Sequence, residues 1–300
     1  MIGEAPAQVV APARLRRGLG GLRRFIGASW LNVLGVGLVA LVVLLAVFGS
    51  QIAPRSPSHV SLLDRLKPPS ASHPFGTDDL GRDLFSRVLA GARISLEVAA
   101  IILSISVAFG TVLGIIAGLV GGLVDELIMR ATDLFLAFPA LILAAAIAAT
   151  LGPSLDHTVL ALSTVYWPWY TRLVRAQVLA LREREFVVAA RVAGASTPGI
   201  VFRHLLPNVL PLVIVQASLD VGYAILFTSS LSFLGLGAQP PTPEWGAMMT
   251  DARAFLRDFW WYATFPGLAL ALTVLGFNLL GDGLRDWVDP RLRGTLRGFR

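Results

Sequence analysis

Few residues in this chain could carry a chemical reaction. Cysteine is absent, which excludes disulfides, thiolate metal sites and a cysteine nucleophile. The only lysine, Lys67, follows a leucine and precedes a proline, whereas a phosphate-binding P-loop needs Gly-Lys-Ser/Thr. The histidines lie far apart and lack the spacing of a zinc site: His59, His73, His157 and His204. We therefore expect no catalytic residue, no metal and no bound cofactor in this chain.

The composition points to the membrane. Hydrophobic residues make up 55% of the 300 residues and charged residues 15%, against roughly 25% charged residues in soluble domains. The mean hydropathy of +0.70 excludes disorder and disfavours an ordinary soluble enzyme. The net charge is +6. Because the arginines stand at the ends of apolar runs, a membrane explains this charge better than nucleic acid does.

Weakly charged stretches predict six transmembrane helices in an all-α integral membrane protein. A helix that crosses about 30 Å of hydrocarbon needs about 20 mostly apolar residues. The six stretches are 25–54 (densest at 30–48), 98–124, 134–155, 157–171 with Arg172 and Arg175 following on the same helix, 205–236, and 259–281. The glycines at 110, 114 and 118 lie four apart, a spacing that lets membrane helices approach closely, here within the bundle.

The distribution of arginine predicts that both termini are cytoplasmic. Arginines gather in the N-terminal tail, after the fourth stretch and in the C-terminal tail, as the positive-inside rule requires. The first apolar helix is too long for a signal peptide and lacks a clear cleavage site, so we expect it to be retained. The predicted divisions are a cytoplasmic tail at 1–29, the first helix and an outer loop at 30–93, a core at 94–284 and a cytoplasmic tail at 285–300.

The cytoplasmic connector before the fifth stretch is the most informative segment. Good helix formers at 183–193 precede Gly194, which readily ends a helix. Ser196 or Thr197 can cap a second helix that has Pro198 at its first position. Pro207 is expected to interrupt that helix. The small residues Ala189 and Ala190 would permit a close docking partner, although a connector that packs only on its own bundle fits equally well.

This connector resembles the EAA loop of ABC-importer permeases. The family pattern is Glu-Ala-Ala, three residues, Gly, nine residues, then Ile-x-Leu-Pro. Here Ala189-Ala190, Gly194 and His204-Leu205-Leu206-Pro207 meet that spacing, with Val188 in place of the glutamate and His204 in place of the isoleucine. The change at Val188 removes a carboxylate that could pair with a partner.

Other segments extend the resemblance to the C-type permease subunit of dipeptide, oligopeptide and nickel importers. Together they cover roughly residues 25–293. They are 73–87 with 91–96, 130–133 with 138–139, 231–237 with 239–241, and 281–286 with 289–290.

The resemblance implies a type I importer permease (MetI-like) fold in the bacterial inner membrane. A second, homologous permease subunit would complete the pathway, and an extracytoplasmic binding protein would deliver the cargo. ABC ATPase subunits would hold ATP and Mg and grip a coupling helix at 188–206. Peptides are the implied cargo; nickel chelates, glutathione and opines are carried by similar permeases. The coupling residues would be Val188, Ala189, Ala190, Arg191, Gly194, Ala195, Ser196, Arg203, His204 and Pro207.

Asp220 is the single acidic residue within the fifth stretch. A charge at mid-bilayer costs roughly 2.5–3.5 kcal/mol, so its side chain should face water, a partner or the pathway. Asp220, with nearby Tyr223, could line the substrate path or bind a peptide amino group. Alternatively, Asp220 is hydrogen-bonded to Tyr223 or to a neighbouring helix, or is protonated.

Two further clusters of charge are expected to pair within the chain. One is Asp125, Glu126, Arg130 and Asp133, and the other is Asp78, Asp79 and Asp83 beside Arg82 and Arg87. Two other classes of protein fit the sequence less well. An ion-coupled secondary transporter or channel usually shows repeats or several intramembrane charges, and no internal repeat is evident. A membrane-embedded enzyme would need paired intramembrane carboxylates, a zinc motif or a Gly-x-Ser-x-Gly elbow, and none is visible.

Overall fold

The computed structural model describes residues 29–288, and the described chain is helical without a β-strand. This confirms the predicted all-α class. The helices are α2 (Trp30–Ile52), α3 (Leu84–Val120), α4 (Gly122–Leu136), α5 (Ala140–Leu151), α6 (Leu155–Arg182), α7 (Glu185–Val192), α8 (Thr197–Ile200), α9 (Leu206–Phe233), α10 (Trp245–Ala252) and α11 (Trp261–Val288). The arginines of the two predicted tails, apart from Arg285, lie outside the described residues.

Four helical runs are long and apolar enough to cross a membrane: α2, α3, the run Thr197–Phe233 and α11. The pair α4 and α5 counts as a fifth if it forms one broken span. The helix α6, at 28 residues, is also long enough to cross a membrane, but it is more polar than those four runs. The count of six spans is compatible with this fold and stays a prediction.

Two predicted boundaries were wrong. The stretch 134–155 is not one helix, because the chain bends by 87° between α4 and α5, where Pro139 lacks an amide hydrogen and restricts the preceding residue. The stretch at 98–124 belongs to α3, which begins earlier, at Leu84. There the Asp83 carboxylate accepts a hydrogen bond from the Ser86 amide. The helix α3 ends at Gly121, whose φ is +70°.

The helices α3 and α6 pack so closely that only glycine fits between them. A Cβ atom on Gly114 would lie 2.7 Å from the Thr171 carbonyl oxygen and from Val174 Cβ. Gly110 and Gly118 meet α6 in the same way. The predicted use of these glycines in packing within the chain is therefore confirmed.

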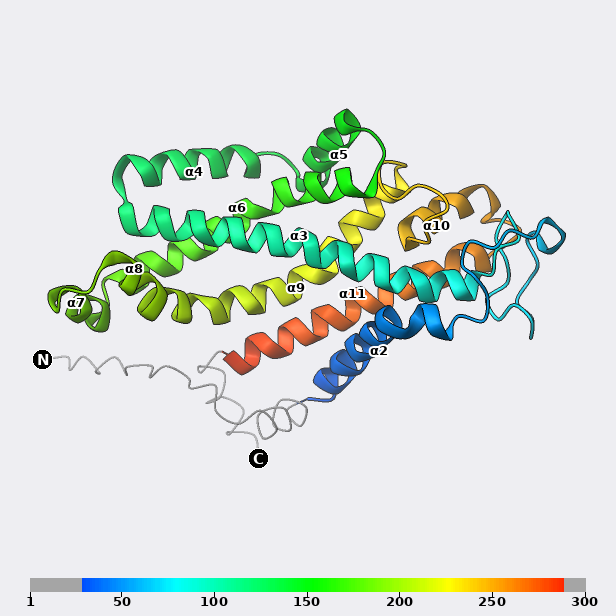
Figure 1. Cartoon of the computed structure of the whole chain (residues 1–300), viewed down its shortest axis with the longest axis horizontal. Helices are drawn as coiled ribbons and strands as arrows, with labels where there is room; N and C mark the ends of the chain where they lie inside the picture. Colours follow the sequence, from blue (N-terminus) through cyan, green and yellow to red (C-terminus); the bar gives the residue numbers. More distant parts are fainter. Residues whose placement is uncertain (1–28, 289–300) are drawn as a thin grey trace, which may run out of the picture.

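The two ends of the molecule are formed by different elements (Figure 1). The short helices α7 and α8 lie at one end, beside the start of α9 and the adjoining ends of α3 and α6. The loop at 53–83 and α10 lie at the opposite end. Along the side of the bundle, α2 packs on α11 and α3, with Gly35 against Leu279 and Gly49 against Leu89.

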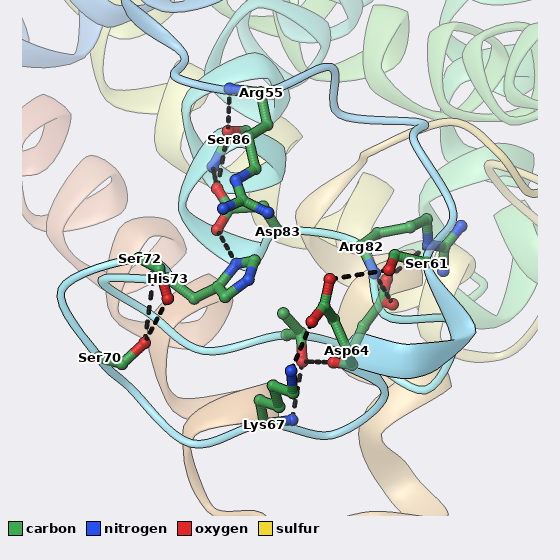
Figure 2. A network of polar contacts seen from close by, with 12 residues as sticks. Arg55, Ser61, Asp64, Lys67, Ser70, Ser72, His73, Arg82, Asp83 and Ser86 are labelled. Atoms are coloured by element: carbon green, nitrogen blue, oxygen red, sulfur yellow. Dashed lines mark hydrogen bonds and ion pairs between the residues drawn. The ribbon is translucent and has the colours of Figure 1, made fainter.

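Ion pairs join residues across the loop at 53–83 and the start of α3. Arg82 Nε donates to Asp78 Oδ2 over 2.5 Å, and His73 Nδ1 lies 2.9 Å from Asp83 Oδ1. Figure 2 shows this network, in which Lys67 also binds Asp64. The hydrogen bond from Lys67, supported by one from Ser61, lowers the pKa of Asp64 to about 2.

The predicted pairing of the outer acidic residues within the chain is confirmed. Arg87 Nε lies 3.5 Å from Asp78 Oδ2, and both side chains are buried. Asp79 accepts a hydrogen bond from the Tyr262 hydroxyl at 2.7 Å.

Filling the α3–α6 contact should destabilise the fold. We expect Gly114→Leu to lower the stability of the bundle by about 2 kcal/mol or more, because the backbone of α6 cannot move away locally. Thermal unfolding of the purified protein measures the change. Gly37→Leu in α2 is the matched control, since a Cβ there meets nothing within 4 Å. Equal unfolding temperatures for the two variants would contradict the packing argument.

Candidate functional site

The connector between α6 and α9 forms the predicted helix, turn and second helix. Gly194, with φ of +81°, ends α7, and the Ala195 amide donates to the Ala190 carbonyl. The Ser196 hydroxyl accepts a hydrogen bond from the Gly199 amide at 3.4 Å, which caps α8. The sequence left Ser196 and Thr197 as alternative caps, and the structure selects Ser196.

The predicted interruption at Pro207 was wrong. The chain stays helical from Thr197 to Phe233, and the strain of the proline is absorbed by one wider π-helical turn, Val201–Leu205. Pro207 lies in the first turn of α9, where a missing amide hydrogen costs little. The α8 end of the connector is therefore joined directly to α9 without a flexible loop.

Three buried side chains anchor the connector to the core. Val187 on α7 and Leu205 are fully buried, and Ile200 is 5% exposed. All three belong to the largest apolar cluster of the described chain, together with side chains of α3 and α6. A force applied to α7 would therefore be transmitted to the bundle and not absorbed by a loose loop.

The side of the connector away from these three anchors carries exposed apolar side chains. Val192 is 84% exposed, and Val188, one helical turn away, is 43% exposed. Phe186 and Phe202 are also exposed large apolar residues on this segment. Exposed apolar groups that gather in one place indicate an interaction site. We call this face, formed by Phe186, Val188, Val192 and Phe202, the connector face.

Arginines surround the connector face. Arg184, Arg191 and Arg203 are exposed, and none of them takes part in the ion pairs formed within residues 29–288. Unpaired cations around an apolar patch favour a protein partner that carries carboxylates at matching positions.

The remaining predicted coupling residues lie on the same segment. Ala189 is exposed and Ala190 is half-buried, while Gly194, Ala195 and Ser196 form the exposed turn. The ring of His204 is half-buried, with its centroid 6.1 Å from that of Phe186. Sequence reasoning missed Phe186, Val192 and Phe202 as surface residues. The four-residue spacing of Val188 and Val192 in a charged segment was the available signal.

Asp220 joins α9 to α6. The hydroxyl of Tyr170 donates to Asp220 Oδ2 at 2.6 Å, and Gln216 Nε2 donates to Oδ1 at 3.0 Å. Asp220 is only 8% exposed. Of the partners considered from the sequence, the neighbouring helix is the one observed. Tyr223 is 51% exposed and does not share in these hydrogen bonds.

Two ion pairs tie α4 to α6 near the same end of the molecule as the connector. Arg175 holds Asp125 through both carboxylate oxygens, and Arg172 Nη2 donates to Asp133 Oδ1 at 2.6 Å. Glu126 pairs with Arg130 on α4 at 3.6 Å. The predicted pairing of this cluster is confirmed. In the described chain, no three His, Asp or Glu side chains are grouped as a metal ion would need.

Comparisons with known proteins agree with this arrangement. Residues 110–294 match the model of the binding-protein-dependent transport system inner membrane component. The dipeptide transport system permease protein DppC of Escherichia coli (strain K12) is 50% identical over 267 residues, 87% of this chain and 89% of the relative. DppC of Alkalihalophilus pseudofirmus is 47% identical over 263 residues, 88% of this chain and 86% of the relative. The probable D,D-dipeptide transport system permease protein DdpC of Escherichia coli (strain K12) is 44% identical over 266 residues, 89% of each chain.

The family model covers more than half of the chain, and the relatives cover most of it. These matches agree with an all-helical protein with several membrane-spanning helices. The chain is therefore a membrane protein that belongs to the family of binding-protein-dependent transport system inner membrane components.

Proposed function

We propose that this chain is the transmembrane permease subunit of an ATP-driven importer of dipeptides and oligopeptides. The names of its relatives support peptides as the cargo. ATP and Mg would be bound by separate ATPase subunits. A second, homologous permease subunit would complete the translocation path, and an extracytoplasmic binding protein would deliver the peptide. The N-terminus and the C-terminus would both be cytoplasmic.

The observation that carries the coupling proposal is the connector face. It is apolar and exposed, and it is bordered by arginines that form no ion pair within residues 29–288. Val187 anchors its α7 part, and Phe202 lies on the helical run that continues into α9. An ATPase subunit that closes on ATP would move this segment as a rigid lever and reorient α9. Reversing a 1:99 population requires about 5.5 kcal/mol of differential binding, so the contact between the two proteins must be firm.

An ion-coupled transporter is less well supported. Such a protein needs a coupling-ion site near the bilayer midplane. The buried carboxylate on α9, Asp220, has both oxygens hydrogen-bonded by Tyr170 and Gln216. Both oxygens therefore already serve to join helix residues within this chain, and the position of Asp220 is explained without a coupling ion.

A charge placed on the connector face should uncouple transport without disturbing the fold. We expect Val192→Glu to reduce ATP-dependent peptide uptake at least about tenfold, because the carboxylate would be buried without a partner when the ATPase docks. Uptake into proteoliposomes and copurification of the ATPase subunit measure the effect. Val60→Glu, an exposed valine of the outer loop, is the control. Uptake equal to that of the control would refute the lever.

For Asp220 we propose an interhelical clamp, whereas Tyr223 remains a proposed residue of the path. We expect Asp220→Asn to retain most of the peptide uptake, because an amide can still accept the hydrogen bond from Tyr170. Asp220→Leu should lower the unfolding temperature, since it leaves the buried Tyr170 hydroxyl without its acceptor. A stable Asp220→Asn protein without uptake would instead assign the charge to transport.

A further inference from the structure

One exposed ion pair lies on α3, away from the connector end of the molecule. Arg93 Nε donates to Glu97 Oε1 at 2.7 Å, and the two side chains are 62% and 56% exposed. Neither side chain forms a hydrogen bond or ion pair with another helix of the described chain. The other ion pairs of the helical bundle either link two helices or lie toward the connector end.

The packing of α2 places this pair at membrane depth. Gly49, near the outer end of α2, abuts Leu89 of α3. Val42, in the middle of α2, shares one buried cluster with Leu84, Val88 and Ala92. Glu97 lies eight residues further into α3 than Leu89, a rise of about 12 Å. Arg93 and Glu97 are therefore level with the interior of a helix that carries no charge over its 23 residues.

A guanidinium and a carboxylate at this depth do not face lipid. Charged side chains in spanning segments face a water-filled cavity, a pathway or a protein partner, because hydrocarbon cannot solvate them. The two groups are exposed in this subunit, so their free hydrogen-bonding positions must be solvated from outside it. Ile101 and Ser104 continue the same exposed face one and two turns further along α3.

The chemistry of the pair matches that of a short peptide. A guanidinium binds a carboxylate through two parallel hydrogen bonds, and a glutamate accepts hydrogen bonds from an ammonium group. Side chains four residues apart on a helix have Cβ atoms about 5–6 Å apart. The charged ends of an extended dipeptide are separated by at most about 7 Å. One dipeptide can therefore reach both side chains.

We propose that Arg93 and Glu97 line the aqueous translocation path and form a subsite for the charged termini of a short peptide in transit. Arg93 takes the carboxylate, and Glu97 takes the ammonium group. This inference rests on the proposed function. A permanent contact with the second permease subunit is the competing explanation for the exposure of the pair.

The first experiment measures water access and protection by cargo. Because the chain has no cysteine, Arg93→Cys and Glu97→Cys introduce single thiols. The assembled transporter is treated with a charged, membrane-impermeant methanethiosulfonate from both sides of the membrane, with and without dialanine and the binding protein. We expect both thiols to react, and to react several-fold more slowly with dialanine. Leu44→Cys, an exposed α2 residue at similar depth, should not react.

Three results would overturn the proposal. If both thiols stay as unreactive as the control in every state, the face meets lipid or the partner subunit. If they react equally fast with and without dialanine, the path is wet there but holds no cargo subsite. Thiols that react in a complex whose parent protein imports no dipeptide would refute the proposed function, and with it the subsite. The reaction of the thiols without dialanine thus shows whether water reaches positions 93 and 97, whatever the cargo is.

The second experiment distinguishes recognition of the peptide by Arg93 and Glu97 from a role in which the two side chains only neutralise each other's charge. The double variant R93E/E97R keeps an ion pair but reverses its direction along α3. We expect it to assemble normally and to lose dialanine uptake about tenfold or more, because a peptide that arrives in the orientation set by the binding protein meets a like charge at each terminus. Normal uptake by this variant would show that the pair only neutralises itself, and would overturn the subsite.

Discussion

The structure depends on a rigid connection between the connector at 183–205 and the helical bundle. Val187, Ile200 and Leu205 hold the connector against the core from one side. From the other end, the π-helical turn at Val201–Leu205 carries the helix into α9 without a break. A loop at either point would dissipate any displacement of α7. Because neither is present, a displacement of α7 would reach the bundle, as the handle proposed around Val192 requires.

Inside the bundle, polar groups serve mainly to join helices. Tyr170 and Asp220 link α6 to α9, and Arg175 and Asp125 link α6 to α4. Such links are favoured in a membrane, because the hydrocarbon contains no water to form hydrogen bonds with an unpaired polar group. The close backbone contact at Gly110, Gly114 and Gly118 adds α3 to the same unit. The helix α6 thus lies at the centre of the fold, which explains why it is more polar than the helices around it.

Much of this arrangement follows from the sequence. Apolar runs predicted α2, α9 and α11, and local chemistry predicted α7, the Gly194 turn and a cap at Ser196 or Thr197, of which the structure has Ser196. The bend between α4 and α5 was missed because composition does not reveal a change of direction. The early start of α3 was missed because it depends on Asp83 capping a helix whose first turns are charged.

The site was predicted less completely than the fold. Motif spacing identified the connector, yet it could not say which side chains point outward, since burial of Val187 fixes the rotation of α7 only in three dimensions. The partner of Asp220 on α6 was likewise invisible, because Tyr170 lies 50 residues away in the chain. The depth proposed for the exposed side chains of Arg93 and Glu97 depends on how α2 packs against α3, and the sequence does not reveal that packing.

Site-specific photocrosslinking at position 192 tests the central claim most directly. A photoreactive phenylalanine analogue at Val192 should form an adduct with the ATPase subunit in the assembled transporter, and the adduct should be identifiable by mass spectrometry. The same analogue at Val60, in the outer loop, should not. If position 192 instead reacts only with lipid, with this chain or with nothing, the connector is not a handle for an ATPase.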